Sequence, residues 1–322
     1  MAELRWNPMT KDWVMIASHR QNRPQMPKNW CPFCPGSGKV PDSYDVLKYD
    51  NDFPALSVTP PQPDDVANGF FKTAPAYGKC EVVLYSPEHN GKLTDLSGEH
   101  LKKLAELWTE RFNALSADEN IKYVFIFENR GEVVGVTMPH PHGQIYGYSF
   151  IPKKIALEID SAAEYYDENG RCLFCDMLDN EREFGKRIIF ENEHFTVFLP
   201  FFTEYPYGVY IMPRRHVPTI AALNDDERAA FAVTVKDVVG MLDSLFDYSF
   251  PYMMCMHNAP VNSGNFDENY HFHIEFFPPM RSADKQKFNA SSETGVWAHC
   301  NPTCPEATSE ELRAAFAKFK ST

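Results

Sequence analysis

Two histidines separated by one residue stand in the segment Pro139-His140-Pro141-His142-Gly143-Gln144. In an extended chain, His140 and His142 point to one face, and Gln144 follows on that face two residues later. The prolines lack backbone donors, which suits a strand end or an edge strand. A neutral imidazole can attack phosphorus and form a phosphoramidate that passes the group on. The segment therefore predicts a reaction centre for phosphoryl or nucleotidyl transfer.

Such a reaction needs hydrogen-bond donors placed in advance around the phosphoryl oxygens. The candidate donors are Gln144, the backbone amides around Gly135 and Gly143, and the guanidinium groups of Arg20 or Arg23. The sequence contains no Ser/His/Asp hydrolase elbow, Walker loop or dinucleotide-binding glycine fingerprint. Histidine-mediated transfer is therefore the chemistry that the motifs favour.

Two C-x2-C pairs predict two metal sites, each completed by two histidines. The first set is Cys31, Cys34, His89 and His140, and the second is Cys172, Cys175, His216 and His271. Four such ligands leave no open coordination position, so we expect two structural zinc ions. Zinc on His140 would fix the strand that carries His142. A competing His/carboxylate site in the same region as the second set, where the metal could be iron, is offered by Glu158, His257, His273 and Glu275.

The elements that position these residues occur twice along the chain. Each half has a Cys pair, a strand ending in a histidine, a helix, a strand and a His-x-His motif, which indicates duplication of one unit. We place the halves at residues 1–160 and 161–322, with a polar linker near 152–170. The expected strands are 79–85, 123–128, 195–199, 208–212 and 252–256, and the expected helices are 95–115 and 225–246.

Composition excludes several classes of protein. The 322-residue chain has a formal charge of −13, which argues against a broad surface for nucleic acid. No apolar run is long enough to cross a bilayer, and the N-terminus lacks the apolar core of a signal peptide. We therefore expect a cytoplasmic protein without a membrane partner, in which the eight cysteines favour metal over disulfides.

Residues 127–144 closely resemble the active-site segment of the galactose-1-phosphate uridylyltransferase family, within the histidine-triad superfamily. The resemblance covers essentially the whole chain. Further segments that match the family in the same order are 18–24, the knuckle at Cys31 and Cys34, 51–56, 86–89 and 256–260.

The resemblance implies a ping-pong exchange. His142 would attack the α-phosphorus of UDP-glucose, release glucose 1-phosphate and hold UMP, which galactose 1-phosphate would take to give UDP-galactose. Gln144 would bond the phosphoryl oxygens. The resemblance assigns the nucleotide or its phosphates to Arg20, Arg23, Asn51, Asp52, Asn129 and Thr137, and the hexose to Lys287, Phe288 and Glu293. It also implies an α+β fold of two halves, each an antiparallel sheet with packed helices, and a homodimer that shares residues between its sites.

Three features depart from the family pattern. Ser292 stands where the family has an aromatic hexose contact, and Thr137 stands where many members have serine. Some relatives build their second metal site from a glutamate and three histidines, corresponding roughly to Glu158, His257 and His273. The second Cys pair of this chain favours Cys2His2 instead.

Two other functions remain open. One is an ADP-sugar phosphorylase or another nucleotidyl transferase of the same superfamily, although Gly143 favours the uridylyltransferase because adenylyl relatives tend to have serine there. The other is a zinc-stabilised scaffold that binds nucleotides without turnover. A scaffold would be expected to lack the pair of His142 and Gln144, and this chain has both.

Overall fold

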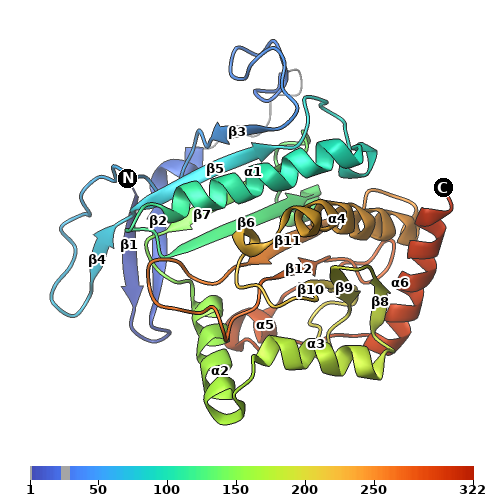
Figure 1. Cartoon of the computed structure of the whole chain (residues 1–322). Coiled ribbons are helices and arrows are strands. Elements are labelled where there is room, and N and C mark those ends of the chain that lie inside the picture. Colours follow the sequence, from blue (N-terminus) through green and yellow to red (C-terminus); the bar gives the residue numbers. More distant parts are fainter. Residues whose placement is uncertain (1, 23–29) are drawn as a thin grey trace.

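The computed structural model describes residues 2–22 and 30–322, which form two antiparallel sheets and the helices packed on them (Figure 1). The strands are β1 (Ala2–Asn7), β2 (Asp12–Ala17), β3 (Leu47–Asp50), β4 (Thr73–Pro75), β5 (Gly78–Leu84), β6 (Tyr123–Arg130), β7 (His142–Tyr148), β8 (Ile188–Glu191), β9 (Phe195–Phe198), β10 (Tyr210–Pro213), β11 (Tyr252–His257) and β12 (His273–Phe277). The helices are α1 (Gly98–Ser116), α2 (Lys153–Asn169), α3 (Leu173–Phe184), α4 (Asp225–Phe246), α5 (Ser291–Val296) and α6 (Pro305–Lys320). Short 3-10 turns are η1 (Ser18–Asn22), η2 (Leu93–Asp95), η3 (Glu132–Val134) and η4 (Ile220–Ala222).

The larger sheet is built from two similar halves joined side by side. Its strand order is β3-β5-β7-β6-β11-β12-β10-β9-β8. β6 and β11 pair antiparallel, with Arg130 opposite Tyr252 and Ile126 opposite Met256. On the side of β6, the strands β7, β5 and β3 follow outward, and on the side of β11, the strands β12, β10 and β9 follow outward. On both sides the central strand is followed by the next strand in the chain and then by strands that precede it in the chain. The expected α+β fold of two halves is confirmed, and the two predicted sheets are one continuous sheet.

Helices α1 and α4 lie side by side across one face of this sheet (Figure 1). α1 buries Leu101, Leu104, Trp108 and Phe112, which recur at helical spacing along one side. Fully burying each such side chain contributes roughly 1.5–3 kcal/mol. α4 begins with a capping box in which Asn224 and Glu227 bond each other's backbone amides. The two helices thus cover the face of the sheet opposite the one on which the Gln144 side chain lies.

Strand β7 divides its side chains between these two faces. Ile145 is fully buried in the core beneath the helices, whereas Gln144 and Tyr146 alternate to the opposite face. The two prolines lie immediately before the strand, so the expectation of a strand end is confirmed. β7 itself is a central strand between β5 and β6.

Two sequence-based expectations about element boundaries are wrong. The segment predicted as a linker forms helix α2, because Ile155, Ile159 and Ala162 give it an apolar stripe that packs inward. The division of the chain at residue 160 falls inside this helix and stays a prediction. The helix expected from residue 95 begins at Gly98, where the Ser97 side chain accepts from the amide of His100.

The smaller sheet, of order β2-β1-β4, carries the segment that leads into η1. Trp6 and Trp13, which pair across β1 and β2, have ring centroids 5.2 Å apart. In the part of the chain that the structure describes, no helix combines the length and apolarity needed to span a bilayer.

Candidate active site

The tautomer of His142 is fixed by the backbone. Its Nδ1 lies 2.7 Å from the carbonyl oxygen of His140. Because a carbonyl can only accept, Nδ1 carries a proton and donates it, and in the neutral ring the lone pair is on Nε2. The ring also packs against Phe33, with centroids 5.5 Å apart. These contacts orient Nε2 as the nitrogen that can act as a nucleophile.

A polar cavity of about 240 Å³ adjoins His142 on the side away from the helices. It brings together several residues that the sequence analysis had selected from distant segments. Its lining consists of Arg20, Phe127, Asn129, Gly135, Val136, Thr137, His142, Gln144 and Tyr146. Arg20 comes from η1, Asn129 from β6 and Gln144 from β7. The cavity therefore combines one guanidinium with amide and hydroxyl groups, a combination that can hold an anion.

The side-chain amide of Gln144 is oriented by Tyr146, two residues further along β7. The Tyr146 hydroxyl donates to Gln144 Oε1 over 3.1 Å. Since the oxygen of the amide accepts this bond, its NH2 group is available to donate to an oxygen in the cavity. Gly135 adds backbone here, with a φ of 81° that favours glycine. The sequence analysis had missed Tyr146, although its place on the same strand face, two residues after Gln144, was a usable signal.

Asn51 and Asp52, which the resemblance assigns to the nucleotide or its phosphates, lie outside the cavities that His142 lines. Besides the polar cavity, His142 lines a larger cavity of about 1040 Å³ that also borders Cys31 and Cys34. Among the described residues, neither Asn51 nor Asp52 lines either cavity. Asp52 accepts the Tyr49 hydroxyl at 2.9 and 2.8 Å, and Tyr49 packs on Phe33 with centroids 5.4 Å apart. The aromatic rings of Tyr49 and Phe33 thus connect this carboxylate to the reaction centre. Arg23 lies outside the described residues.

The predicted hexose residues form a separate group near α5. Lys287 is buried, with its Nζ 3.8 Å from Glu293 and 5.0 Å from the centre of the Tyr205 ring. Phe288 is 70% exposed. Within the described parts of the chain, none of these three lines either cavity beside His142. The three residues predicted to contact the hexose therefore lie apart from the cavities that His142 lines.

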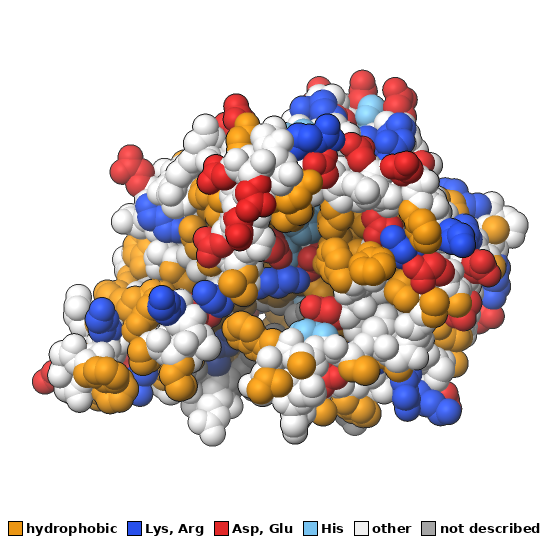
Figure 2. Space-filling view, turned by 90° about the horizontal axis from the view of Figure 1, so that it is seen from below, with side chains coloured by type: hydrophobic (Ala, Val, Ile, Leu, Met, Phe, Trp, Pro, Cys, Tyr) orange, Lys and Arg blue, Asp and Glu red, His pale blue; other side chains and the backbone are white. Residues whose placement is uncertain are grey.

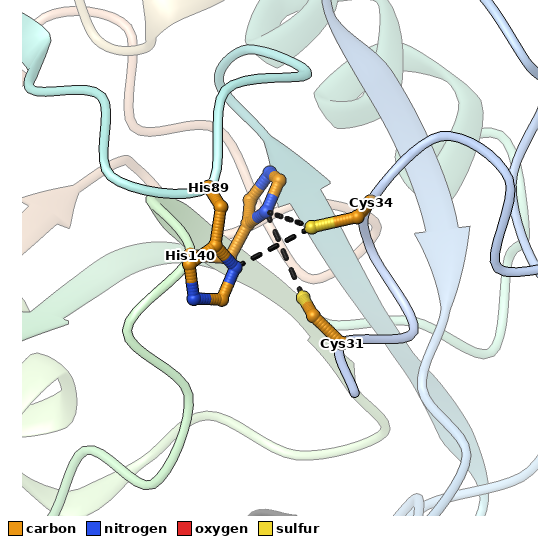
Figure 3. Close-up of side chains that lie close together, drawn as sticks. All are labelled: Cys31, Cys34, His89 and His140. Carbon is orange, nitrogen blue, oxygen red and sulfur yellow. Dashed lines mark hydrogen bonds between the residues drawn. The ribbon is translucent and has the colours of Figure 1, made fainter. Parts of the chain in front are cut away.

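The first predicted metal site is assembled as expected (Figure 3). One ligand atom from each of Cys31, Cys34, His89 and His140 lies within 4.8 Å of the others. His140 Nδ1 is 3.8 and 3.7 Å from the two sulfurs, and His89 Nδ1 is 3.4 Å from Cys34 Sγ. A tetrahedral site with zinc bond lengths has S···N edges of about 3.6 Å, so the donor set fits zinc.

Outer contacts of this group also suit a metal. His140 Nε2 lies 2.8 Å from the carbonyl of Ser86 and donates to it, which leaves Nδ1 as the ligand atom. Burial lowers the pKa of His140, so the ring is neutral. Burial raises the pKa of Cys34 to about 11. A thiolate there therefore needs a cation, which a bound metal would supply.

The second Cys/His group has the same donors in a looser arrangement. Ligand atoms of Cys172, Cys175 and His216 lie within 4.8 Å of one another. His271 Nδ1 is 3.5 Å from Cys175 Sγ. His216 Nε2 donates to the carbonyl of Asp267 over 2.8 Å, so its Nδ1 faces the thiols. Burial lowers the pKa of His271 to about 3, which keeps the ring neutral. Three of the four predicted ligands thus form a compact set, and His271 lies beside Cys175 outside that set.

The competing His/carboxylate group is also present, next to the second Cys/His group. It consists of Glu158, His257, His273 and Glu275. His257 Nδ1 lies 3.1 Å from Glu158, and His273 Nε2 lies 3.6 Å from Glu275. Although burial opposes ionisation, His257 and Lys154 hold the pKa of Glu275 well below its usual range. Both groups that the sequence left as alternatives for the second metal therefore exist.

Figure 2 shows a face that is hollowed near its centre, where histidine and basic side chains are visible.

Comparisons with known proteins agree over nearly the whole chain. The family model described as galactose-1-phosphate uridyl transferase, N-terminal domain, matches residues 1–152, and the model of the C-terminal domain matches residues 158–295. A galactose-1-phosphate uridylyltransferase from Thermotoga maritima is 42% identical over 314 residues, which cover 97% of this chain and 98% of the relative. A galactose-1-phosphate uridylyltransferase from Haemophilus influenzae is 31% identical, and the alignment covers 96% of this chain and 93% of that relative.

Solved structures show the same fold. A uridylyltransferase structure that is 32% identical superposes with a TM-score of 0.91 and covers 98% of this chain and 99% of its own. An ADP-glucose phosphorylase from Arabidopsis thaliana, at 22% identity, has a TM-score of 0.74 and covers 97% of this chain and 99% of its own. The latter similarity concerns the fold alone.

Proposed function

The chain belongs to the galactose-1-phosphate uridylyltransferase family, and we propose that it exchanges UMP between UDP-glucose and galactose 1-phosphate through a covalent uridylyl group on His142. One observation carries the assignment of His142. Its Nδ1 is tied to the carbonyl of His140 at 2.7 Å, beside a cavity that Arg20 and Gln144 also line.

In the first half-reaction, the Nε2 lone pair attacks the α-phosphorus of UDP-glucose. The bond from this phosphorus to the bridging oxygen breaks, and that oxygen leaves with the electron pair as part of glucose 1-phosphate. In the second, a phosphate oxygen of galactose 1-phosphate attacks the same phosphorus, and the N–P bond returns its electrons to His142. The NH2 group of Gln144 donates to a phosphoryl oxygen, and the guanidinium of Arg20 balances its charge. Asn129, Gly135 and Thr137 supply further polar contacts from the same cavity.

We propose zinc in both Cys/His groups, with a structural role. Bound zinc would hold Cys31, Cys34, His89 and His140 together, and His140 carries the carbonyl that fixes the tautomer of His142. If the second metal is instead held by Glu158, His257 and His273, oxygen and nitrogen donors would favour iron there.

We further propose a homodimer in which a second copy supplies Lys287, Phe288 and Glu293 to each reaction centre. The separation of these residues from the cavities of their own protomer supports this arrangement. An exposed apolar surface on the small sheet offers a site for association. It is formed by Met9, Val14, Ile16, Phe70 and Phe71. We place the enzyme in the cytoplasm, where reduced cysteines can remain metal ligands.

The experiment that tests the function is intact-protein mass spectrometry after brief mixing with UDP-glucose. Wild type should gain the mass of one UMP and lose it on addition of galactose 1-phosphate, whereas His142→Ala should gain nothing. ADP-glucose serves as the control nucleotide sugar. A gain of AMP would identify an adenylyl transferase, and no adduct with either nucleotide would support a scaffold that binds without turnover.

A further inference from the structure

A carboxylate is buried directly beneath the catalytic strand. Glu128 lies on β6 among the residues that face the helix layer, and it is only 6% exposed. Its Oε2 accepts the hydroxyl of Tyr85 and its Oε1 accepts the hydroxyl of Tyr252, each over 3.0 Å. Both tyrosines are fully buried. An ionisable group in such a place is costly unless its partners are well placed, so its retention calls for a role.

Tyr85 connects this carboxylate to the residue between His142 and Gln144. Tyr85 follows β5, Glu128 lies on β6, and β7 runs between these two strands. The Tyr85 side chain therefore passes beneath β7 to reach Glu128. A Cβ added at Gly143 would lie 2.5 Å from the Tyr85 hydroxyl oxygen. The backbone of β7 at Gly143 thus rests directly on this hydroxyl.

Tyr85 is itself held firmly on both sides. Its amide donates to the carbonyl of Pro141 over 3.2 Å, and its carbonyl accepts from His100 Nε2 over 2.7 Å. Its ring packs edge-on against Trp108 of α1, with centroids 5.8 Å apart. The backbone and ring of Tyr85 are therefore held by the segment before β7 and by α1, and its hydroxyl is held by Glu128 on β6.

Tyr252 brings the second half of the molecule into the same network. It lies on β11 directly opposite Arg130 in the pairing of the two halves. The guanidinium of Arg130 lies 5.4 Å from the centre of the Tyr252 ring and 2.8 Å from Asp243. Burial raises the pKa of Glu128 to about 7, against the opposing charge of Arg130. Glu128 thus joins β5, β6 and β11 beneath the one strand that carries the nucleophile.

We propose that Glu128 is a positioning residue for uridylyl transfer, which acts by holding the Tyr85 hydroxyl beneath Gly143 and so sets the place of His142 and Gln144 relative to the phosphate. This inference rests on the proposed function, in which His142 is the nucleophile. Without the bond to Glu128, the Tyr85 ring can move and β7 loses its support at Gly143. A shift of about 1 Å in a reacting group can cost about 100-fold in rate.

The test compares the rate of UMP-adduct formation in a single turnover for Tyr85→Phe, Tyr252→Phe and Glu128→Gln. We expect Tyr85→Phe to slow the step by about 10- to 100-fold. The affinity for UDP-glucose, measured by calorimetry in the His142→Ala background, should stay within about threefold. Glu128→Gln keeps the shape and one acceptor, so it should be the mildest of the three.

Tyr207→Phe is the matched control, because Tyr207 is also a buried tyrosine that donates to a glutamate, Glu311, over 2.9 Å. It removes the same kind of bond away from β7 and should leave the rate unchanged.

A second arm tests the contact at Gly143 directly. Gly143→Ala should abolish adduct formation, and adding Tyr85→Phe should restore part of the rate because the clashing oxygen is removed. Restoration should be incomplete, since Tyr85 Cζ and the Phe127 carbonyl would each still be 3.2 Å from the new Cβ.

The rates are measured well below the Tm of each variant. If Tyr85→Phe and Tyr252→Phe both form the adduct as fast as wild type, the positioning role of Glu128 is overturned, even if both variants are less stable. If Gly143→Ala is fully active, the proposed contact is overturned as well. If wild type forms no adduct, the proposed function fails and the inference falls with it.

Discussion

His273 occupies in the second half the place that His142 occupies in the first. Each opens its strand, β12 or β7. Each Nδ1 donates to the carbonyl of the histidine two residues earlier, over 2.9 Å for His273 and 2.7 Å for His142. Two residues later the halves differ, since the first has Gln144 and the second has Glu275. A neutral donor faces the first histidine, whereas a carboxylate lies 3.6 Å from the second.

This difference predicts the effect of Gln144→Glu. The substitution removes one donor and puts a negative charge where the phosphoryl oxygens must lie, so adduct formation should fall by about 1,000-fold. Single-turnover mass spectrometry measures this rate. Tyr146→Phe, which removes only the contact that orients the amide, should cost much less; equal losses would contradict the role of Gln144 as a donor.

Metal content should separate the two candidate groups in the second half. We expect two zinc ions per chain, and elemental analysis should find one fewer in Cys34→Ser and one fewer in Cys172→Ser. Glu158→Gln should leave the count unchanged. Loss of a metal in Glu158→Gln but not in Cys172→Ser would move the second site to the His/carboxylate group, and iron in place of zinc would count against the proposed ligands.

The stability of the first half should depend on its metal. Cys34→Ser leaves a buried thiol and two histidines without their shared ion, so Tm should fall and the adduct should form slowly or not at all. Differential scanning calorimetry with and without a chelator gives the comparison. A chelator-treated wild type that keeps both its Tm and its rate would show that no metal supports this site.

Glu128 should give stability a defined pH dependence. Burial raises the pKa of Glu128 in the folded protein to about 7, above the value of 4.5 that is usual for a glutamate. Below pH 4.5, Glu128 is protonated in both the folded and the unfolded protein. Between pH 4.5 and 7 it ionises in the unfolded chain but stays protonated in the folded protein, so the free energy of unfolding falls as pH rises towards 7. Urea unfolding at pH 5 and pH 8 should show that Glu128→Gln gains stability relative to wild type at the higher pH. No change in this difference would contradict the raised pKa.

Mixed dimers test the sharing of hexose residues. His142→Ala and Lys287→Ala should each be nearly inactive alone. After refolding together, activity should return to about a quarter of wild type, because half of randomly assembled dimers are mixed and each contains one complete site. Sedimentation should confirm the dimer in both variants, and no recovery would place Lys287 in the site of its own protomer.

The sequence alone predicted the parts of the site that short spacing encodes. The C-x2-C pairs and the His-x-His motifs bring their ligands together through turns and strand alternation, so Cys31, Cys34 and His140 were found with their partners. The single sheet was not predicted, because the pairing of β6 with β11 joins segments more than a hundred residues apart and leaves no local pattern. The hydrogen bonds that join Tyr85, Glu128 and Tyr252 were not predicted for the same reason. The one local sign was a glutamate directly after the apolar run of residues 123–127.

The pairing of β6 with β11 also bears on how such a molecule can arise. Each half alone would expose this strand along its edge, a row of unsatisfied amides and carbonyls that readily pairs with another chain. Two identical copies of an ancestral half could satisfy each other along that edge and form a symmetric pair with two equal histidine sites. Joining the copies in one gene would remove the requirement for symmetry. One site could then keep its amide and its chemistry while the other acquired a carboxylate.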